Sequence, residues 1–180
     1  GNSTTFNNWK TQGVNWHGAG AEGGISNVMI FWGRTADGRP WNYWYSVDWM
    51  QINLDLRVAN AVMNGSNDPI NPLYLNPDGV NRVQAVIVGT MGSAVTYGLA
   101  LGTVIQTELD AVTFMSNLEN GVYAGNLVCN AVPFNVYYGS SGNPSDYKTG
   151  TYNGFSVTYT PLRGFESITI NLNVTDFVAA

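Results

Sequence analysis

Hydrophobic and polar positions follow two different periods along this chain, and the change of period separates predicted strands from predicted helices. A short apolar run bounded by glycine, Asn27–Gly33, indicates a buried strand. Alternating large aromatic residues over Trp41–Val47 indicate a second strand, and the Asp37-Gly38 pair between the two runs indicates a turn. We therefore expect a β-hairpin in this part of the chain.

From Trp49 onwards the apolar residues recur every three or four positions, which is the period of one helical face. The pattern predicts a helix over Val47–Asn64, with Ser46 as its N-cap and Gly65 just beyond its end. The side that we expect to face the core consists of Trp49, Ile52, Leu56, Ala59 and Met63, with Val62 beside them.

A second helix is predicted over Pro77–Leu99. Asn76 is a suitable N-cap, and Pro77 suits the first helical position. Gly89 and Gly92 each cost about 1 kcal/mol relative to alanine inside a helix, unless another backbone packs closely against them. The apolar stripe of this helix consists of Val80, Val83, Ile87, Met91 and Ala94.

After Gly102 the pattern becomes that of β-structure. Strands are predicted within Thr103–Phe114, Asn126–Gly139 and Phe155–Leu162, and the polar stretch Gly139–Gly154 is predicted to be a mobile loop. The clearest alternation lies near the C-terminus, where aliphatic residues alternate with Thr and Asn at Ile168, Ile170, Leu172 and Val174. This last strand carries no Lys, Pro or Gly that would protect an exposed edge.

These elements predict one α+β domain over residues 25–180, with a mostly antiparallel sheet and two helices packed on one face. Residues 1–24 are polar and rich in Gly and Asn, so we expect a flexible arm or loop there. The chain begins at Gly1 rather than Met, and we expect it to be a fragment or a processed form.

Charge narrows the classes of partner. Charged residues make up 11% of the chain, against about a quarter in typical domains, and the net charge is −5. Because the seven cations are spread out, we expect neither nucleic-acid binding nor attraction to anionic membranes. No apolar run approaches the roughly 20 residues that a membrane span needs.

Candidate chemistry is sparse. The Gly18–Gly23 stretch, GAGAEG, matches the letters of the dinucleotide fingerprint but lacks a strand before it and a helix after it, so a flexible loop is the better interpretation. His17 and Cys129 are the only residues of their types. We expect His17 at the surface, Cys129 as a small buried hydrophobe, and neither a metal site nor a cofactor.

Two features remain open to a functional interpretation. Two carboxylate pairs, Asp48 with Asp55 and Glu108 with Asp110, are in principle suited to a glycosidase, but Asp48 and Asp55 fall on a predicted exposed helical face and we expect no enzyme. Trp41 and Trp44 either pack in the core beneath the first helix or stack on sugars at the surface.

The order of three segments resembles a known family. They are GRTADGRPWNYWYSVDWMQINLDLRV at Gly33–Val58, PLYLNPDGVNRVQAVI at Pro72–Ile87, and PLRGFESITINLNVTDF at Pro161–Phe177. This arrangement resembles the C-terminal region of the sheath-like tail proteins of contractile phages, over roughly Ile25–Phe177. Members of that family are longer, and the aromatic load around Trp41 is heavier here than the family pattern requires. The matching positions are Asp48 and Trp49, then Pro72, Tyr74, Asp78 and Gly79, and finally Arg163.

The resemblance implies a structural role. The chain would be a self-assembling subunit of a contractile tail sheath, located in the virion and assembled in the host cytoplasm. Its partners would be further copies of itself in a helical or ring assembly, together with other tail proteins. The candidates for the subunit junction, through exchanged strands, are Ile168, Ile170, Leu172 and Val174. The alternative is an extracellular or virion-surface carbohydrate-binding domain that uses Trp41 and Trp44.

Overall fold

The computed structural model describes residues 3–22, 25–31, 33–140 and 142–163, and it divides into two compact units. Unit 1 comprises residues 1–40 and 163–180, and unit 2 comprises residues 41–162. The predicted domain boundary at residue 24 therefore differs from the observed one, because that position lies between two paired strands of unit 1.

The described residues of unit 1 form one helix and one hairpin. Helix α1 spans Ser3–Thr11, and strands β1 (Trp16–Glu22) and β2 (Ile25–Phe31) pair antiparallel. The rings of Phe6 and Trp16 stack with centroids 5.8 Å apart. The predicted strand at Asn27–Gly33 is confirmed with a shift of two residues. The flexible arm predicted for residues 1–24 is wrong, because aromatic contacts and strand pairing order the Gly-rich segment.

The turn around Asp37-Gly38 is confirmed, but the hairpin that it was expected to join is not. The Thr35 N–H donates to the Arg39 carbonyl at 2.9 Å, and Gly38 has a φ of +78°. An isolated bridge between Arg34 and Pro40 is the pairing that flanks the turn. After Pro40 the chain enters helix α2 directly.

Helix α2 spans Trp41–Ser66, so the strand predicted at Trp41–Val47 is wrong. Aromatic residues every second position over seven residues also satisfy helical spacings of three and four, and the longer apolar period downstream continues into them. Ser46 is no N-cap, because it lies inside the helix, buried, and its hydroxyl donates to the Leu99 carbonyl at 2.7 Å. Gly65 likewise lies within the helix rather than beyond it.

Helix α3 spans Pro77–Thr96, as predicted to within three residues. Its N-cap is Asn76, whose side chain accepts a hydrogen bond from the Gly79 N–H at 2.7 Å, and Pro77 begins the helix. The predicted core stripe is confirmed, since its members are buried or half-buried: Val80, Val83, Ile87, Met91 and Ala94.

The face predicted for α2 is wrong. Met50 is buried at 3% exposure, whereas Ile52, Leu56 and Met63 are 56%, 58% and 56% exposed. The residues of α2 that pack against the core are Met50, Trp49, Leu54 and Val58. Helix α2 is apolar on two opposite sides, and periodicity alone does not decide which side is covered.

The sheet of unit 2 is mixed rather than mostly antiparallel. Strands β3 (Val104–Thr107) and β4 (Leu127–Ala131) are parallel and are connected through helix α4 (Ala111–Glu119). Strand β5 (Phe155–Thr158) pairs antiparallel with β4, which gives the order β3-β4-β5. Helix α5 (Phe134–Tyr137) lies in the second half of the segment predicted as a strand, Asn126–Gly139, and helix α6 (Asp146–Thr149) lies within the predicted loop, Gly139–Gly154.

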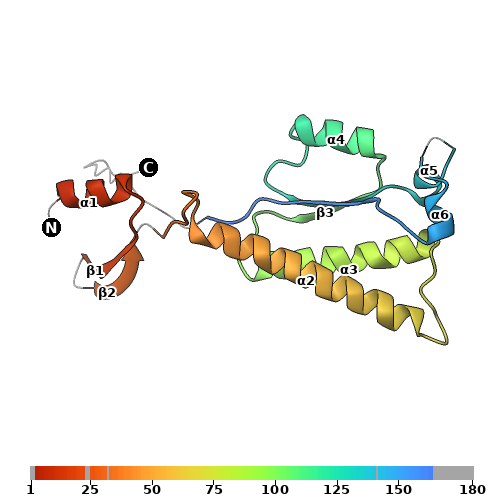
Figure 1. Cartoon of the computed structure of the whole chain (residues 1–180), viewed down its shortest axis with the longest axis horizontal. Helices are drawn as coiled ribbons and strands as arrows, with labels where there is room; N and C mark the ends of the chain where they lie inside the picture. The colour runs from red at the N-terminus through yellow and green to blue at the C-terminus, as the bar shows by residue number, and fades with distance from the viewer. Residues whose placement is uncertain (1–2, 23–24, 32, 141, 164–180) are drawn as a thin grey trace, which may run out of the picture. The chain divides into compact units, whose positions relative to one another are not determined.

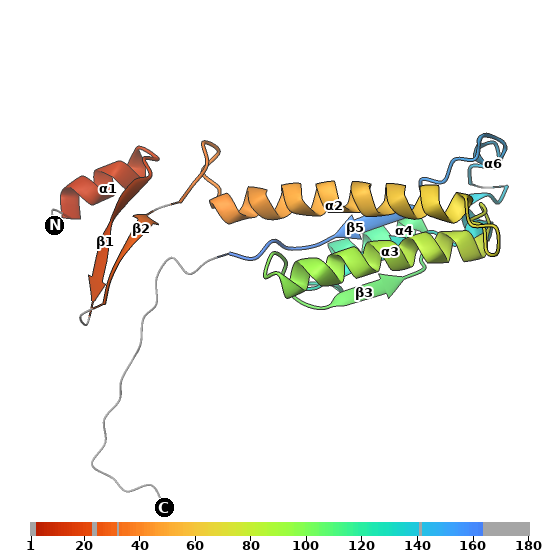
Figure 2. The ribbon, with the colours of Figure 1, turned by 90° about the horizontal axis from the view of Figure 1, so that it is seen from below.

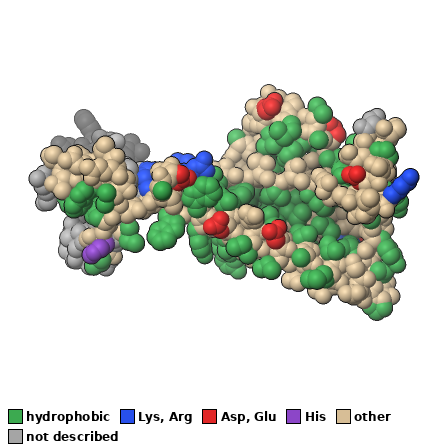
Figure 3. Space-filling model, in the orientation of Figure 1, with side chains coloured by type: hydrophobic (Ala, Val, Ile, Leu, Met, Phe, Trp, Pro, Cys, Tyr) green, Lys and Arg blue, Asp and Glu red, His purple; other side chains and the backbone are tan. Residues whose placement is uncertain are grey.

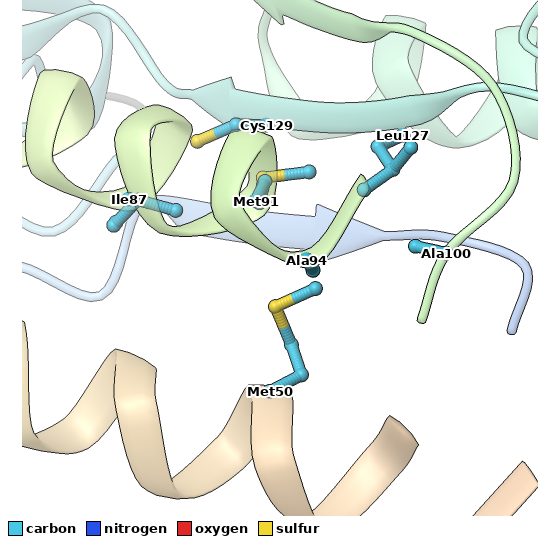
Figure 4. Close-up of a cluster of buried hydrophobic side chains, with 7 residues drawn as sticks. All are labelled: Met50, Ile87, Met91, Ala94, Ala100, Leu127 and Cys129. Carbon is cyan, nitrogen blue, oxygen red and sulfur yellow. The ribbon is translucent and has the colours of Figure 1, made fainter. Parts of the chain in front are cut away.

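Helices cover both faces of this sheet, and this arrangement corrects the expectation of helices on one face. Helices α2 and α3 lie on one side and α4 on the other (Figures 1 and 2). The α+β class is confirmed. The core lies between the α2–α3 layer and the sheet, where seven side chains meet (Figure 4): Met50, Ile87, Met91, Ala94, Ala100, Leu127 and Cys129.

Candidate assembly surfaces

The aromatic residues at the start of α2 lie at the surface. Trp41 is 63% exposed and Trp44 is 37% exposed, and Tyr45 is also exposed. Trp44 meets the ring of Tyr43 edge to face, with centroids 5.3 Å apart. The core-packing interpretation of Trp41 and Trp44 is therefore wrong, because the helix turns both indoles away from the core. Trp49, about two helical turns after Trp41, is half-buried against Tyr97.

The outward face of α2 continues this apolar surface. Ile52, Leu56 and Met63 follow Trp41 and Tyr45 along the same side of the helix, opposite Met50. We call this set, Trp41, Tyr45, Ile52, Leu56 and Met63, the outer stripe of α2. Asp48 and Asp55 border the outer stripe and are exposed, as expected from their spacing. Hydrophobic side chains appear along α2 in Figure 3.

Strand β5 is an edge of the three-stranded sheet. The Val132 N–H donates to the Gly154 carbonyl at 2.9 Å, and β4 and β5 continue in the same antiparallel register. Because main-chain groups alternate in direction along such a pair, the N–H and C=O groups of Ser156 and Thr158 point towards β4. The N–H and C=O groups of Phe155 and Val157 therefore point outward, where the sheet has no further strand among the described residues.

An apolar groove lies beside this edge. A pocket of about 340 Å³ is lined by Leu54, Val58, Ala59 and Asp55 of α2, together with Ile87 and Val157. A second pocket of about 370 Å³ shares Val58 and reaches the end of α2, with a largely apolar lining that includes Val62, Leu73, Tyr152 and Phe155. The edge of β5 thus combines outward main-chain groups, which pair with no other described strand, with apolar space for side chains.

The predicted junction strand, residues 168–174, cannot be compared with the fold. Ile168, Ile170, Leu172 and Val174 lie outside the described residues, which end at Arg163. Sequence reasoning identified Phe155–Leu162 as a strand but missed that β5 would be an edge. Edge position depends on strand order, and the only signal in the sequence is the shortness of the strand.

The groups considered for catalysis serve structural roles or lie apart. Asp110 is the N-cap of α4, and its hydrogen bonds from the Thr113 hydroxyl and from the Thr113 and Val112 N–H groups lower the pKa of its carboxyl. Burial raises the pKa of the Cys129 thiol to about 11, so this group stays protonated at neutral pH. His17 is exposed, on strand β1 rather than in a loop, and the GAGAEG stretch also lies largely in that strand.

Within the described ranges, no group of three or more His, Cys, Asp and Glu side chains is placed to hold a metal ion. A buried polar network instead ties α3 to the sheet. The Gln84 amide donates to the carbonyls of Thr107 at 3.0 Å and Cys129 at 3.2 Å, and it accepts from Gln106 at 2.9 Å. All of these groups are satisfied, so the network stabilises the fold and offers no free site.

Comparison with known proteins identifies no relative. No family model matches the chain, and neither the curated proteins nor the solved structures contain a match. In the part of the chain that is described, no helix has the length and apolar character to cross a bilayer.

Proposed function

We propose that this chain is a structural subunit of a contractile phage tail sheath, which joins its neighbours by strands added to the edge of its sheet. The observation that carries the proposal is the outer edge of β5, with its outward main-chain groups at Phe155 and Val157 and the apolar groove beside it. An edge of this kind accepts an extended segment through main-chain hydrogen bonds, while pockets select alternate side chains.

The C-terminal sequence supplies a matching segment. Ile168, Ile170, Leu172 and Val174 alternate with Thr and Asn, so an extended conformation would place the aliphatic side chains on one side. These side chains would enter the groove at Leu54 and Val58, and the polar ones would face solvent. A strand donated from one copy to the next is a head-to-tail contact, which propagates into rings or helical tubes. The resemblance to sheath-like tail proteins supports the same role.

The proposal is tested by substitutions that block strand pairing on each side of the junction, in β5 and in the donated strand. Val157→Pro removes an outward N–H without removing a donor to β4, and Ile170→Pro interrupts the donated strand. We expect both variants to fold, as judged by circular dichroism, and to form no tubes or rings in electron micrographs. Val157→Ile, which keeps the N–H, is the matched control and should assemble. Normal assembly of folded Val157→Pro and Ile170→Pro would exclude this junction.

A second candidate function is sugar binding by the start of α2. The exposure of Trp41 and Trp44 favours it, because stacking on a pyranose ring requires an accessible indole. A glycan array on the whole protein, with the Trp41→Ala/Trp44→Ala double variant as control, tests it. A sheath subunit should bind no glycan, whereas a carbohydrate-binding domain should lose its signal in the double variant.

A further inference from the structure

The carboxyl ends of two parallel strands meet at one edge of the sheet in unit 2. Strand β3 ends at Thr107 and strand β4 ends at Ala131, and the two strands run in the same direction. The start of α3 and the short helix α5 lie at this same end of the unit (Figures 1 and 2). In sheets that contain parallel strands, this edge is the usual place for a bound ligand.

A pocket of about 160 Å³ opens at this edge. Its apolar walls include Val80 of α3 and two residues that follow β4, Val132 and Phe134. The volume is below the roughly 300–1,000 Å³ of pockets for drug-sized molecules, so only a small group fits. Three polar side chains also line the pocket, each from a different part of the chain: Asn81 on α3, Glu108 directly after β3, and Asn135 on α5.

The three polar side chains, Asn81, Glu108 and Asn135, are exposed to solvent. None of them forms a hydrogen bond or an ion pair with another residue in the described part of the chain. Together they present one carboxylate and two amide oxygens as acceptors. The pocket therefore holds acceptors from three segments that the described fold does not use.

The pocket carries negative charge. Glu108 is the only charged residue among those that line it, and Asp78 and Asp110 add carboxylates at the starts of α3 and α4. The Glu108 carboxylate also lies close enough to Tyr152 to contribute, after burial and two neighbouring tyrosines, to raising the pKa of that phenol. Because the Tyr152 hydroxyl donates to the Val132 carbonyl in the pocket wall, the charge of Glu108 acts at the pocket.

We propose that this pocket binds a primary alkylammonium group, from a free polyamine or from a lysine side chain. An ammonium group carries one positive charge and three N–H donors, which match one carboxylate and two amide oxygens. The alkyl stem would lie against Val80 and Val132, and the ring of Phe134 would add a cation–π contact. This inference goes beyond the proposed sheath function and does not depend on it.

Charge and hydrogen-bonding capacity select this class of ligand. An anion would be repelled by Glu108. A hydrocarbon would cover the polar groups of the lining without giving them partners, which is costly. A divalent metal ion such as Ca²⁺ takes about six to eight oxygen ligands, usually with several carboxylates, whereas the lining supplies a single carboxylate.

Titration of the full-length protein with n-butylamine tests the site. Calorimetry should give saturable binding, and the NMR signals of the Asn81 and Asn135 side-chain amides should shift along the titration. n-Butanol keeps the stem but lacks the charge, so it should bind at least about tenfold more weakly. Spermidine and Nα-acetyl-lysine methylamide represent the two sources of the ammonium group, and the stronger competitor of n-butylamine identifies the source. Equal binding of n-butanol and n-butylamine would overturn the proposal.

A pair of charge variants locates the binding. Glu108→Gln keeps the shape and removes the charge, and it should fold like wild type because Glu108 is exposed and has no partner among the described residues. Its affinity for n-butylamine should fall by about tenfold or more. Glu119→Gln removes the same charge at the far end of α4, outside the pocket lining, and should bind like wild type. Unchanged affinity in Glu108→Gln, or an equal loss in Glu119→Gln, would exclude this pocket as the site.

Discussion

Gln84 connects helix α3 to the sheet through buried hydrogen bonds. Its amide lies fully buried and spans two strands, donating to carbonyls of β3 and β4 while accepting from Gln106. A long polar side chain within an apolar stripe gives no indication, from sequence, of the carbonyls that it will meet. Burial without a hydrogen bond is costly, so the satisfied amide contributes to specifying how the helix sits on the strands.

Replacing Gln84 should therefore be costly out of proportion to its volume. Gln84→Leu keeps the size but deprives buried polar groups of their partner, and we expect a loss of about 1–3 kcal/mol in the free energy of unfolding. Urea denaturation measures it. Gln106→Leu is the control, because Gln106 is exposed, and its effect should be clearly smaller. Equal effects of the two substitutions would show that the bonds to the strand carbonyls contribute nothing.

Burial of Cys129 should make the free energy of unfolding decrease as the pH rises through the alkaline range. Its thiol pKa is raised from 9.0 to about 11 in the folded state because burial disfavours the thiolate. The contribution is fully present below about pH 9, where the unfolded thiol is still protonated, and it is lost as the pH rises towards 11, by about 2–3 kcal/mol in total. Unfolding curves of wild type and Cys129→Ala at pH 8 and pH 10.5 should show the steeper decline in wild type. Parallel declines would contradict the assignment.

At the scale of elements, the two long helices α2 and α3 were predictable, but the covered face of α2 was not. The short helices α1, α4, α5 and α6 were missed, and α4 begins inside the segment Thr103–Phe114 that was predicted as a strand. The start signals of α3, the N-cap Asn76 and the first helical residue Pro77, act over a few residues, so they can be recognised in the sequence. For α2, two apolar sides compete, and only packing against α3 decided that Met50 rather than Leu56 faces the core. The aromatic run at Trp41–Val47 was misassigned for a related reason, because its alternation fits either period over so short a stretch.

Two substitutions in α2 distinguish its faces. Met50→Ala removes a side chain from the core cluster and should cost about 2–5 kcal/mol in the free energy of unfolding. Leu56→Ala removes an exposed side chain and should change stability by less than about 0.5 kcal/mol. Chemical denaturation of dilute, monomeric protein gives both values. A large loss for Leu56→Ala under those conditions would place the outer stripe in the core after all.

At the scale of the whole molecule, unit 2 contains a complete core. The seven residues of the cluster in Figure 4 all fall within residues 41–162, as do α2, α3 and the three-stranded sheet. The edge of β5, which is proposed for assembly, and the exposed outer stripe of α2 also belong to this unit.

A fragment of residues 41–162 should therefore fold alone. We expect a cooperative urea transition with a midpoint close to that of the corresponding transition in the whole chain, because no core side chain is lost. The comparison uses circular dichroism for helix content and tryptophan fluorescence for packing. A fragment without a cooperative transition would mean that unit 1 supplies contacts on which the core of unit 2 depends.

The sequence by itself determined the α+β class, the turn at Asp37-Gly38, and helix α3 with its cap and buried stripe. It also located strands β2 and β5, predicted at Asn27–Gly33 and Phe155–Leu162, to within a few residues. These features rest on interactions between residues near in sequence or on one unambiguous period. Only the tertiary structure decided that β3 and β4 pair in parallel and that β5 lies at the edge of the sheet. It also decided that the Gly-rich segment β1 forms a strand with β2, and which face of α2 is covered. Each of these features depends on which distant segment packs against a given surface. A hydrophobic pattern indicates that a surface will be buried, but it does not identify the segment that buries it.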